Sequence, residues 1–131
     1  MKVVLDTNVL LAAFACGGVC RDVLKTCILV HHILLSEFIL EEFRRKLQAK
    51  FHMPDADVEA NLSLLRSRCL IVAPAAVDAA ACPDPDDLPV LGTLLAAEAN
   101  CLVTGDKALL HIKNFKGFPI LSPREFLDIP S

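Results

Sequence analysis

Hydrophobic residues form short runs along the chain that alternate with longer amphipathic segments. The runs have the length of β-strands and lie at residues 2–6, 32–35, 70–73, 101–104 and 119–121. Between them, apolar residues recur at helical spacing, which predicts helices at residues 9–14, 19–28, 37–50, 54–69 and 86–100. A capping box at residues 122–125 predicts the start of one more helix, and the Ala/Pro-rich residues 74–85 predict a loop.

Strands that alternate with helices are typical of a parallel sheet, because parallel neighbours need a crossover connection that is usually helical. We therefore predict an α/β fold with three layers, α/β/α, around a parallel sheet of about five strands. The 131 residues are enough to bury a hydrophobic core, so we expect a single domain, 1–131. An apolar content of 54% excludes a disordered chain.

The sequence shows no pattern of secretion or membrane insertion. The longest apolar stretch, residues 27–35, is interrupted by His31 and His32 and is too short to span a bilayer. The first residues lead straight into a strand and lack the layout of a signal peptide. The six cysteines include no Cys-x-x-Cys pair and match no zinc spacing, so we interpret them as small buried thiols. We expect a soluble, cytoplasmic protein that does not bind membranes.

The net charge of −3, from 13 basic and 16 acidic side chains, is not that of a general nucleic-acid binder. If four of the acids bound a divalent cation, 13 basic side chains would remain against 12 acidic ones. A basic surface beside a metal-loaded site is therefore compatible with the composition.

Two of the predicted strands end in a carboxylate. Asp6 follows the first apolar run, and Asp106 follows the run at residues 101–104. In an open parallel sheet, ligands bind outside the carboxyl ends of the strands, so we expect these two acids to converge. Each acid could instead cap the helix after it, since Asp is common at that position.

Glu42 is the third candidate, on the predicted helix 37–50. It lies four residues after Phe38 and three after Ile39, which places it beside the buried stripe of that helix. A carboxylate at that position needs a partner, either a bound ion or Lys46 one turn along the helix.

Asp87 is the fourth candidate, in a segment where Asp84, Asp86 and Asp87 crowd together around two prolines. The helix dipole offsets only about 0.3–1 kcal/mol of their repulsion, and a divalent cation would offset more. The alternative is an acid-rich first turn that stabilises its own helix.

Four carboxylates without histidine suit a hard cation such as Mg²⁺ or Mn²⁺. Sites of this kind activate water for in-line attack on a phosphodiester and neutralise charge on the leaving oxygen. The sequence therefore predicts a metal-dependent hydrolase that needs no covalent nucleophile.

Three segments together resemble the PIN-domain nuclease family, and more narrowly its VapC-like toxins from bacterial type II toxin–antitoxin pairs. They read V-V-L-D-T-N-V-L (residues 3–10), S-E-F-I-L-E-E-F-R-R-K-L (36–47), and D-P-D-D-L-P-V-L followed by L-V-T-G-D-K-A-L-L (84–91 and 102–110). The resemblance implies a divalent-metal endoribonuclease, an RNA substrate, a cognate antitoxin as partner and a homodimer.

Carried over position by position, the family's metal-binding and catalytic acids fall on Asp6, Glu42, Asp87 and Asp106. The resemblance also implies supporting roles for four further residues, namely Thr7, Asn8, Thr104 and Asp84. Asn100 and Ala108 depart from the pattern, because the family often has Asp at both positions.

Contact with RNA would need positive charge beside these acids. Arg45 and Lys46 lie within one turn of Glu42, and Lys107 follows Asp106. Solvated helix faces would explain the same charges equally well.

Two other functions compete with the ribonuclease. A non-catalytic binding module could keep the PIN-like fold and use its acids structurally. A phosphatase or phospho-acceptor domain could use Asp6 as a nucleophile, but Asp6-Thr7-Asn8 lacks the second aspartate of an Asp-x-Asp-x-Thr motif.

Overall fold

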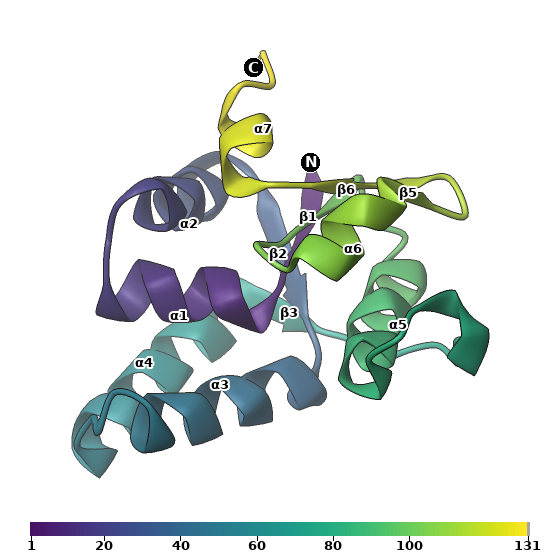
Figure 1. Cartoon of the computed structure of the whole chain (residues 1–131). Helices are drawn as coiled ribbons and strands as arrows, with labels where there is room; N and C mark the ends of the chain where they lie inside the picture. The colour runs from purple at the N-terminus through teal and green to yellow at the C-terminus, as the bar shows by residue number, and fades with distance from the viewer. Residues whose placement is uncertain (131) are drawn as a thin grey trace.

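The computed structural model describes residues 1–130 (Figure 1). Its strands form one sheet in the order β3-β2-β1-β4-β6-β5. Every neighbouring pair is parallel except β5 and β6, which form an antiparallel hairpin. The strands are β1 (Lys2–Leu5), β2 (His32–Leu35), β3 (Cys69–Ile71), β4 (Cys101–Val103), β5 (Asn114–Phe115) and β6 (Phe118–Leu121). The predicted α/β class is confirmed, with a short sixth strand added to the expected five.

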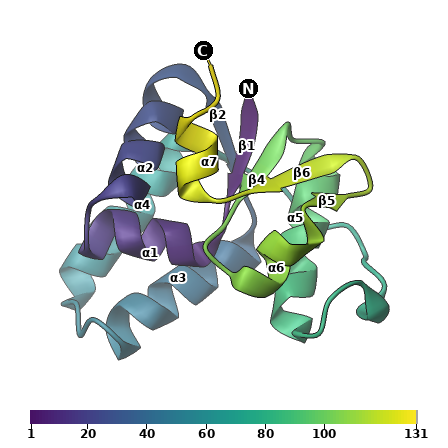
Figure 2. The same ribbon diagram turned by 45° about the horizontal axis from the view of Figure 1, so that its top comes forward.

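Helices flank this sheet. In Figures 1 and 2, α1 and α2 lie to the left of β1 and α5 and α6 to its right. The helices are α1 (Thr7–Ala15), α2 (Val19–Val30), α3 (Glu37–Ala49), α4 (Asp55–Arg68), α5 (Leu88–Ala97), α6 (Lys107–Ile112) and α7 (Pro123–Leu127). A 3-10 turn, η1 (Ala79–Ala81), lies in the segment predicted as a loop. A second one, η2 (Pro85–Asp87), takes the first two residues of the helix predicted at 86–100, so that α5 begins only at Leu88.

The position of β1 between β2 and β4 determines where the strand ends meet. Val3, Val4 and Leu5 are completely buried, as expected for an apolar strand covered on both faces. Leu5 pairs with Val103 of β4, so the residues that follow these two strands leave the sheet side by side. Asp6 and Thr104 are therefore neighbours in space.

The structure corrects several predicted boundaries. Helix α5 ends at Ala97 rather than at residue 100, because Glu98 adopts a left-handed conformation with φ of 48°. Asn100 is not its last residue; its Oδ1 accepts a hydrogen bond from the N–H of Lys2 (2.8 Å). Helix α6 and the two-residue strand β5 were not predicted, because both are too short to show a clear periodicity.

No helix within residues 1–130 is both long enough and apolar enough to span a bilayer. Over the same range the six cysteines are all free thiols. Cys27, Cys82 and Cys101 are buried as expected, but Cys20 and Cys69 are only partly buried, and the interpretation as a buried thiol is wrong for Cys16, which is exposed.

Candidate active site

Asp6 lies at the junction of β1 and α1, buried to 4% exposure. Its carboxylate accepts hydrogen bonds from the N–H of Thr7 (2.7 Å), the hydroxyl of Thr104 (2.8 Å) and the side-chain amide of Asn8 (3.2 Å). Burial raises the pKa of Asp6, while the hydrogen bonds from Thr104 and Thr7 act in the opposite direction. The side chain is thus held in one orientation by three donors.

Thr104 and Asn8 join the ends of β1 and β4. The Thr104 hydroxyl accepts a hydrogen bond from the N–H of Asp106 (3.0 Å) in addition to donating to Asp6. Asn8 Oδ1 accepts from the N–H of Gly105 (2.8 Å). These hydrogen bonds restrict the orientation of both strand-end acids.

The capping interpretation of Asp6 and Asp106 also holds. Asp6 occupies the N-cap of α1, and Asp106 Oδ1 accepts hydrogen bonds from the N–H groups of Ala108 (2.8 Å) and Leu109 (3.4 Å) at the start of α6. Capping and lining a common site are compatible, because a carboxylate has two oxygens with about four acceptor positions.

Glu42 enters the site from α3, with only 12% of its side chain exposed. Lys46 Nζ lies 3.9 Å and Arg45 Nη2 4.0 Å from its carboxylate. The intrahelical partner considered from the sequence is present, and it also brings a positive charge beside the acids.

Asp87 ends η2 and is buried to 7% exposure. Its Oδ2 is buried and has no hydrogen-bond partner within residues 1–130. Burial, followed by the charges of Asp106, Asp6 and Asp84, raises its pKa to about 7. A buried carboxylate oxygen without a donor is costly, so this atom calls for a ligand that the protein chain does not supply.

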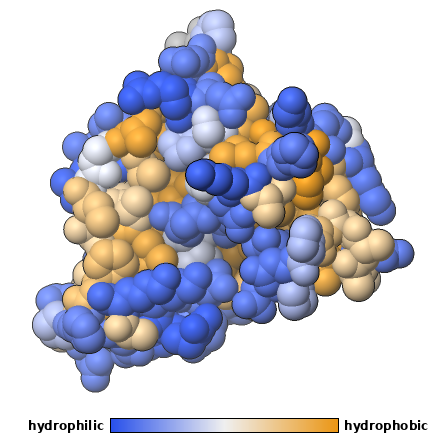
Figure 3. All heavy atoms as spheres, viewed as in Figure 1, coloured by the Kyte–Doolittle hydropathy of each residue, from blue (hydrophilic) through white to orange (hydrophobic). Residues whose placement is uncertain are grey.

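A cavity of about 110 Å³, which we call the acid pocket, brings these side chains together. Its lining consists of Asp6, Thr7, Asn8, Glu42, Lys46, Asp84, Asp86, Asp87 and Asp106. All four predicted acids are present, and Thr104 lies completely buried beneath Asp6. Hydrophilic residues gather near the middle of the face shown in Figure 3, around the junction of α1, α3 and α6.

The three basic candidates occupy different positions. Lys46 lines the acid pocket, and Arg45 lines a neighbouring hollow. Lys107 is exposed at the first residue of α6 and is not part of the lining of either cavity. Asp86, which sequence reasoning treated only as a neighbour of Asp87, lines both cavities.

The carboxylates of the acid pocket fit a hard divalent cation, although they do not form a complete set of ligands around one point. Among residues 1–130, no three His, Cys, Asp or Glu side chains are close enough to hold an ion by themselves. Asp6, Glu42 and Asp106 are each turned toward a partner of their own. Mg²⁺ usually takes only one or two protein carboxylates and keeps several waters, so the unpartnered Asp87 oxygen and a neighbouring acid would suffice.

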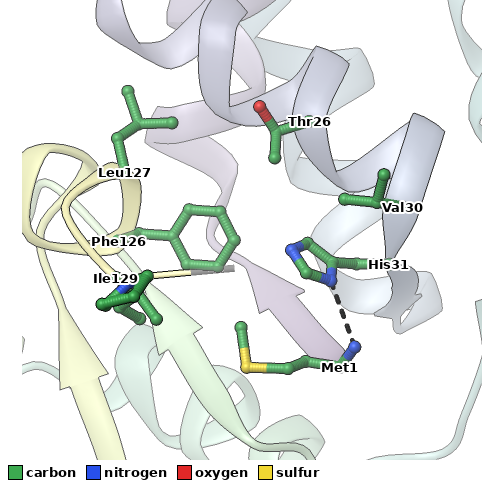
Figure 4. A pocket seen from close by; sticks show the side chains of 8 residues that line it. Met1, Thr26, Val30, His31, Phe126, Leu127 and Ile129 are labelled. Carbon is green, nitrogen blue, oxygen red and sulfur yellow. Dashed lines mark hydrogen bonds between the residues drawn. The ribbon is translucent and has the colours of Figure 1, made fainter.

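A second, larger cavity lies at the other end of β1 (Figure 4). Its volume is about 520 Å³, and its lining is mainly apolar: Met1, Thr26, Val30, His31, Phe126, Leu127, Ile129 and Pro130. His31 accepts a hydrogen bond from the amino group of Met1 (3.1 Å), and its ring meets Phe126 edge to face. This lining contains no carboxylate side chain, so the chemistry predicted from the sequence belongs to the acid pocket.

A family model described as "PIN domain" matches residues 2–108, which include all four acids. The chain belongs to the PIN-domain family. PIN domains are a family of nucleases, so membership gives the general chemical class of the chain. It also confirms the family resemblance inferred from the three sequence segments.

Solved structures share this PIN fold. A chain of the crystal structure of VapBC2 from Rickettsia felis, bound to a DNA fragment from its promoter, matches with a TM-score of 0.68 and 15% identity, over 93% of this chain and 98% of that one. A chain of VapBC-1 from nontypeable Haemophilus influenzae gives a TM-score of 0.66 and 14% identity, over 95% and 99%. A chain of DNA-bound VapBC from Salmonella typhimurium matches with a TM-score of 0.58 and 17% identity, over 94% of this chain and 98% of that one. No curated protein sequence matches the chain.

Proposed function

We propose that this PIN domain is an endoribonuclease that uses Mg²⁺ or Mn²⁺ to hydrolyse RNA phosphodiester bonds. The observation that carries the proposal is the buried Asp87 oxygen, which has no partner within residues 1–130 and belongs to a pocket lined by five further acids. Repulsion among these carboxylates favours binding of a divalent cation at this position.

Asp87 and Asp6, the buried pair, would contact the cation directly, and Glu42 and Asp106 would reach it through the waters that it keeps. When bound, the cation would lower the pKa of water and neutralise charge on the phosphodiester. Thr104 and Asn8 fix the direction of the Asp6 carboxylate, which limits the reorganisation needed during the reaction.

Lys46 is the basic residue best placed to meet a substrate phosphate, because it lines the acid pocket beside Glu42. Arg45 would contact the strand further out, where 62% of its side chain is exposed. Lys107 would contribute only general attraction from the start of α6, since it is exposed and outside the lining of the pocket.

Purified protein should cleave single-stranded RNA when Mg²⁺ or Mn²⁺ is added and stop when a chelator removes the ion. Asp6→Asn should lower the cleavage rate by about a hundredfold or more, since even residues that only support a metal ligand cost 10–100-fold. Asp57→Asn is the matched control, because Asp57 is exposed on α4 and has the same charge change. Cleavage that persists in chelator and in Asp6→Asn would refute the proposal.

The same experiment separates the ribonuclease from a non-catalytic binding module. A module whose acids are only structural should show neither cleavage nor a rise in melting temperature on addition of Mg²⁺ or Mn²⁺. That alternative has support in the partners that Asp6, Glu42 and Asp106 already have within the chain.

We further propose that the chain acts as the toxin of a toxin–antitoxin pair, as a single domain that forms a homodimer. Support comes from the VapBC complexes whose chains share its fold. Expression should arrest bacterial growth, and co-expression of a cognate antitoxin should restore it. Sedimentation equilibrium of the purified protein would test the dimer.

A further inference from the structure

The neighbouring hollow that Arg45 lines has a volume of about 110 Å³ and adjoins the acid pocket. We call it the side hollow. It is lined by Phe38, Glu41, Glu42, Arg45 and Asp86. Glu42 and Asp86 also line the acid pocket, so the two cavities share a wall. A polymer held at the acid pocket would therefore place its next unit at or near the side hollow.

The chemistry of the side hollow comes from one stripe of α3. Phe38, Glu41, Glu42 and Arg45 follow the spacing i, i+3, i+4 and i+7, which places them on the same helical face. Asp86, from η2, completes the lining of the hollow. The lining thus combines a half-buried aromatic ring, two exposed carboxylates, the carboxylate of Glu42 and a guanidinium.

We propose that the side hollow binds one unstacked nucleobase of single-stranded RNA, with a preference for guanine, next to the bond that is cleaved. This inference rests on the proposed ribonuclease function and specifies its substrate. An aromatic side chain beside a cleavage site is a common platform for a splayed base.

The volume and the charges of the side hollow suit a base better than a phosphate. A volume of about 110 Å³ equals roughly four water molecules in the liquid, which is room for part of a flat ring system. Three of the five lining residues are acids, which would repel a phosphate placed inside. Arg45, 62% of whose side chain is exposed, can instead pair with the phosphate that follows the base.

The acids also favour one base over the others. Guanine presents two adjacent N–H donors, on N1 and N2, and a carboxylate can accept both at once. Adenine and cytosine present one amino group beside a ring acceptor, and uracil presents one N–H between two carbonyl oxygens, which a carboxylate repels. Glu41 and Asp86 are exposed and line the side hollow together with Phe38, so either is a candidate acceptor for this edge of a stacked guanine. Glu41 also lies 3.5 Å from Arg44 Nε, which leaves its second oxygen for a base.

The test uses a pool of randomised single-stranded RNA, digested with Mg²⁺ and sequenced at the new ends. Wild type should cut next to guanine, Phe38→Leu should lose about tenfold of that preference, and Phe38→Trp should retain it. Glu41→Gln should reduce the preference for guanine over adenine. Phe51→Leu is the matched control, since Phe51 is exposed just beyond the end of α3 and outside both hollows.

A titration without cleavage distinguishes the possible failures. In NMR spectra of the Mg²⁺-loaded protein, guanosine monophosphate should shift the ring resonances of Phe38, and uridine monophosphate should shift them far less. RNA cleavage without guanine preference, or a preference that Phe38→Leu leaves unchanged, would overturn the side-hollow proposal and leave the ribonuclease intact. If no RNA is cleaved, the ribonuclease proposal fails, and the titration alone decides whether a base binds here.

Discussion

Asp87 combines a buried carboxylate oxygen with three acidic neighbours, and this makes its protonation part of the stability of the protein. Its pKa of about 7 lies above the value of 3.8 expected for an unperturbed aspartate. The folded protein therefore binds more protons at Asp87 than the unfolded chain does between these two values. Stability that is present at low pH should be lost as pH rises toward 7 and above.

We predict that the metal-free protein melts at a lower temperature at pH 8 than at pH 5. Asp87→Asn should remove most of this pH dependence and raise the free energy of unfolding at pH 8 by about 1 kcal/mol. This value is smaller than the full pKa shift would give, because water in the pocket screens the charge of Asp87. The substitution should also abolish the stabilisation by Mg²⁺. Thermal melts followed by circular dichroism would measure each value, with Asp57→Asn as the control. A melting temperature that rises with pH through 7 would contradict this account.

Thr104 is the residue on which the orientation of two acids depends. Thr104→Val keeps the shape but removes the hydroxyl that donates to Asp6 and accepts from the N–H of Asp106. We expect a loss of about 1–3 kcal/mol of stability, because buried groups lose their partners, and a lower cleavage rate. Chemical denaturation and RNA cleavage would be measured in parallel with Thr104→Ser, which should retain most of both. Equal behaviour of the Val and Ser variants would argue against this role.

At the scale of elements, the packing of α5 depends on a close contact between the backbones of Gly92 and Ala75. A Cβ atom on Gly92 would lie only 2.3 Å from the carbonyl oxygen of Ala75, in the segment that leads toward η2. The N–H of Ala75 donates to the carbonyl of Gly92 (2.9 Å), so helix and segment meet backbone to backbone. This contact fixes α5 against the chain that carries Asp84, Asp86 and Asp87.

Gly92→Ala should therefore destabilise the protein. Alanine gains up to about 1 kcal/mol over glycine in helix propensity, but overpacking against a backbone atom costs about 1–3 kcal/mol. We expect a net loss on urea denaturation, together with weaker binding of Mg²⁺ as η2 shifts. An unchanged or higher stability would show that the segment moves away without cost.

The elements also show how far sequence reasoning extends. The apolar strands β1, β2 and β4 and the capping box at Ser122 and Glu125 could be predicted, because their signals are local. The strands of the β5–β6 hairpin are too short to show a periodicity, and only Gly117 marks the hairpin in the sequence. Lys116 and Gly117 both have positive φ, the pattern of a tight hairpin turn that favours glycine.

Part of the candidate site, like part of the fold, could be predicted from the sequence. The convergence of Asp6 and Asp106 follows from parallel strand order, and the place of Glu42 follows from helical spacing. The buried, unpartnered oxygen of Asp87 depends on how η2 packs against the strand ends, which no local pattern encodes. The role of Asp86 as a wall between two hollows was missed for the same reason.

For the whole molecule, the charge balance predicts that metal controls RNA binding. The chain has a net charge of −3, and several of its acids line one pocket. Without a divalent cation, this negative region repels the phosphate backbone.

Affinity for single-stranded RNA should therefore rise when Mg²⁺ replaces Na⁺ at equal ionic strength. Fluorescence anisotropy with a labelled oligonucleotide would measure the affinity, and a gel would confirm that the RNA stays intact during the measurement. Asp87→Asn should bind more RNA than wild type in Na⁺ alone and gain less from Mg²⁺. An affinity that depends only on ionic strength would contradict this prediction.

The acid pocket takes its side chains from two kinds of support. Asp6 follows a fully buried central strand and donates its N–H to the carbonyl of Val103 (3.0 Å), whereas Asp87 ends a 3-10 turn reached through a long irregular segment. Amide hydrogen exchange at Asp6 should require opening of the whole sheet, while exchange around Asp87 needs only a local fluctuation. One half of the pocket is thus rigid and the other adjustable, which would let the same protein accommodate ions of slightly different radius.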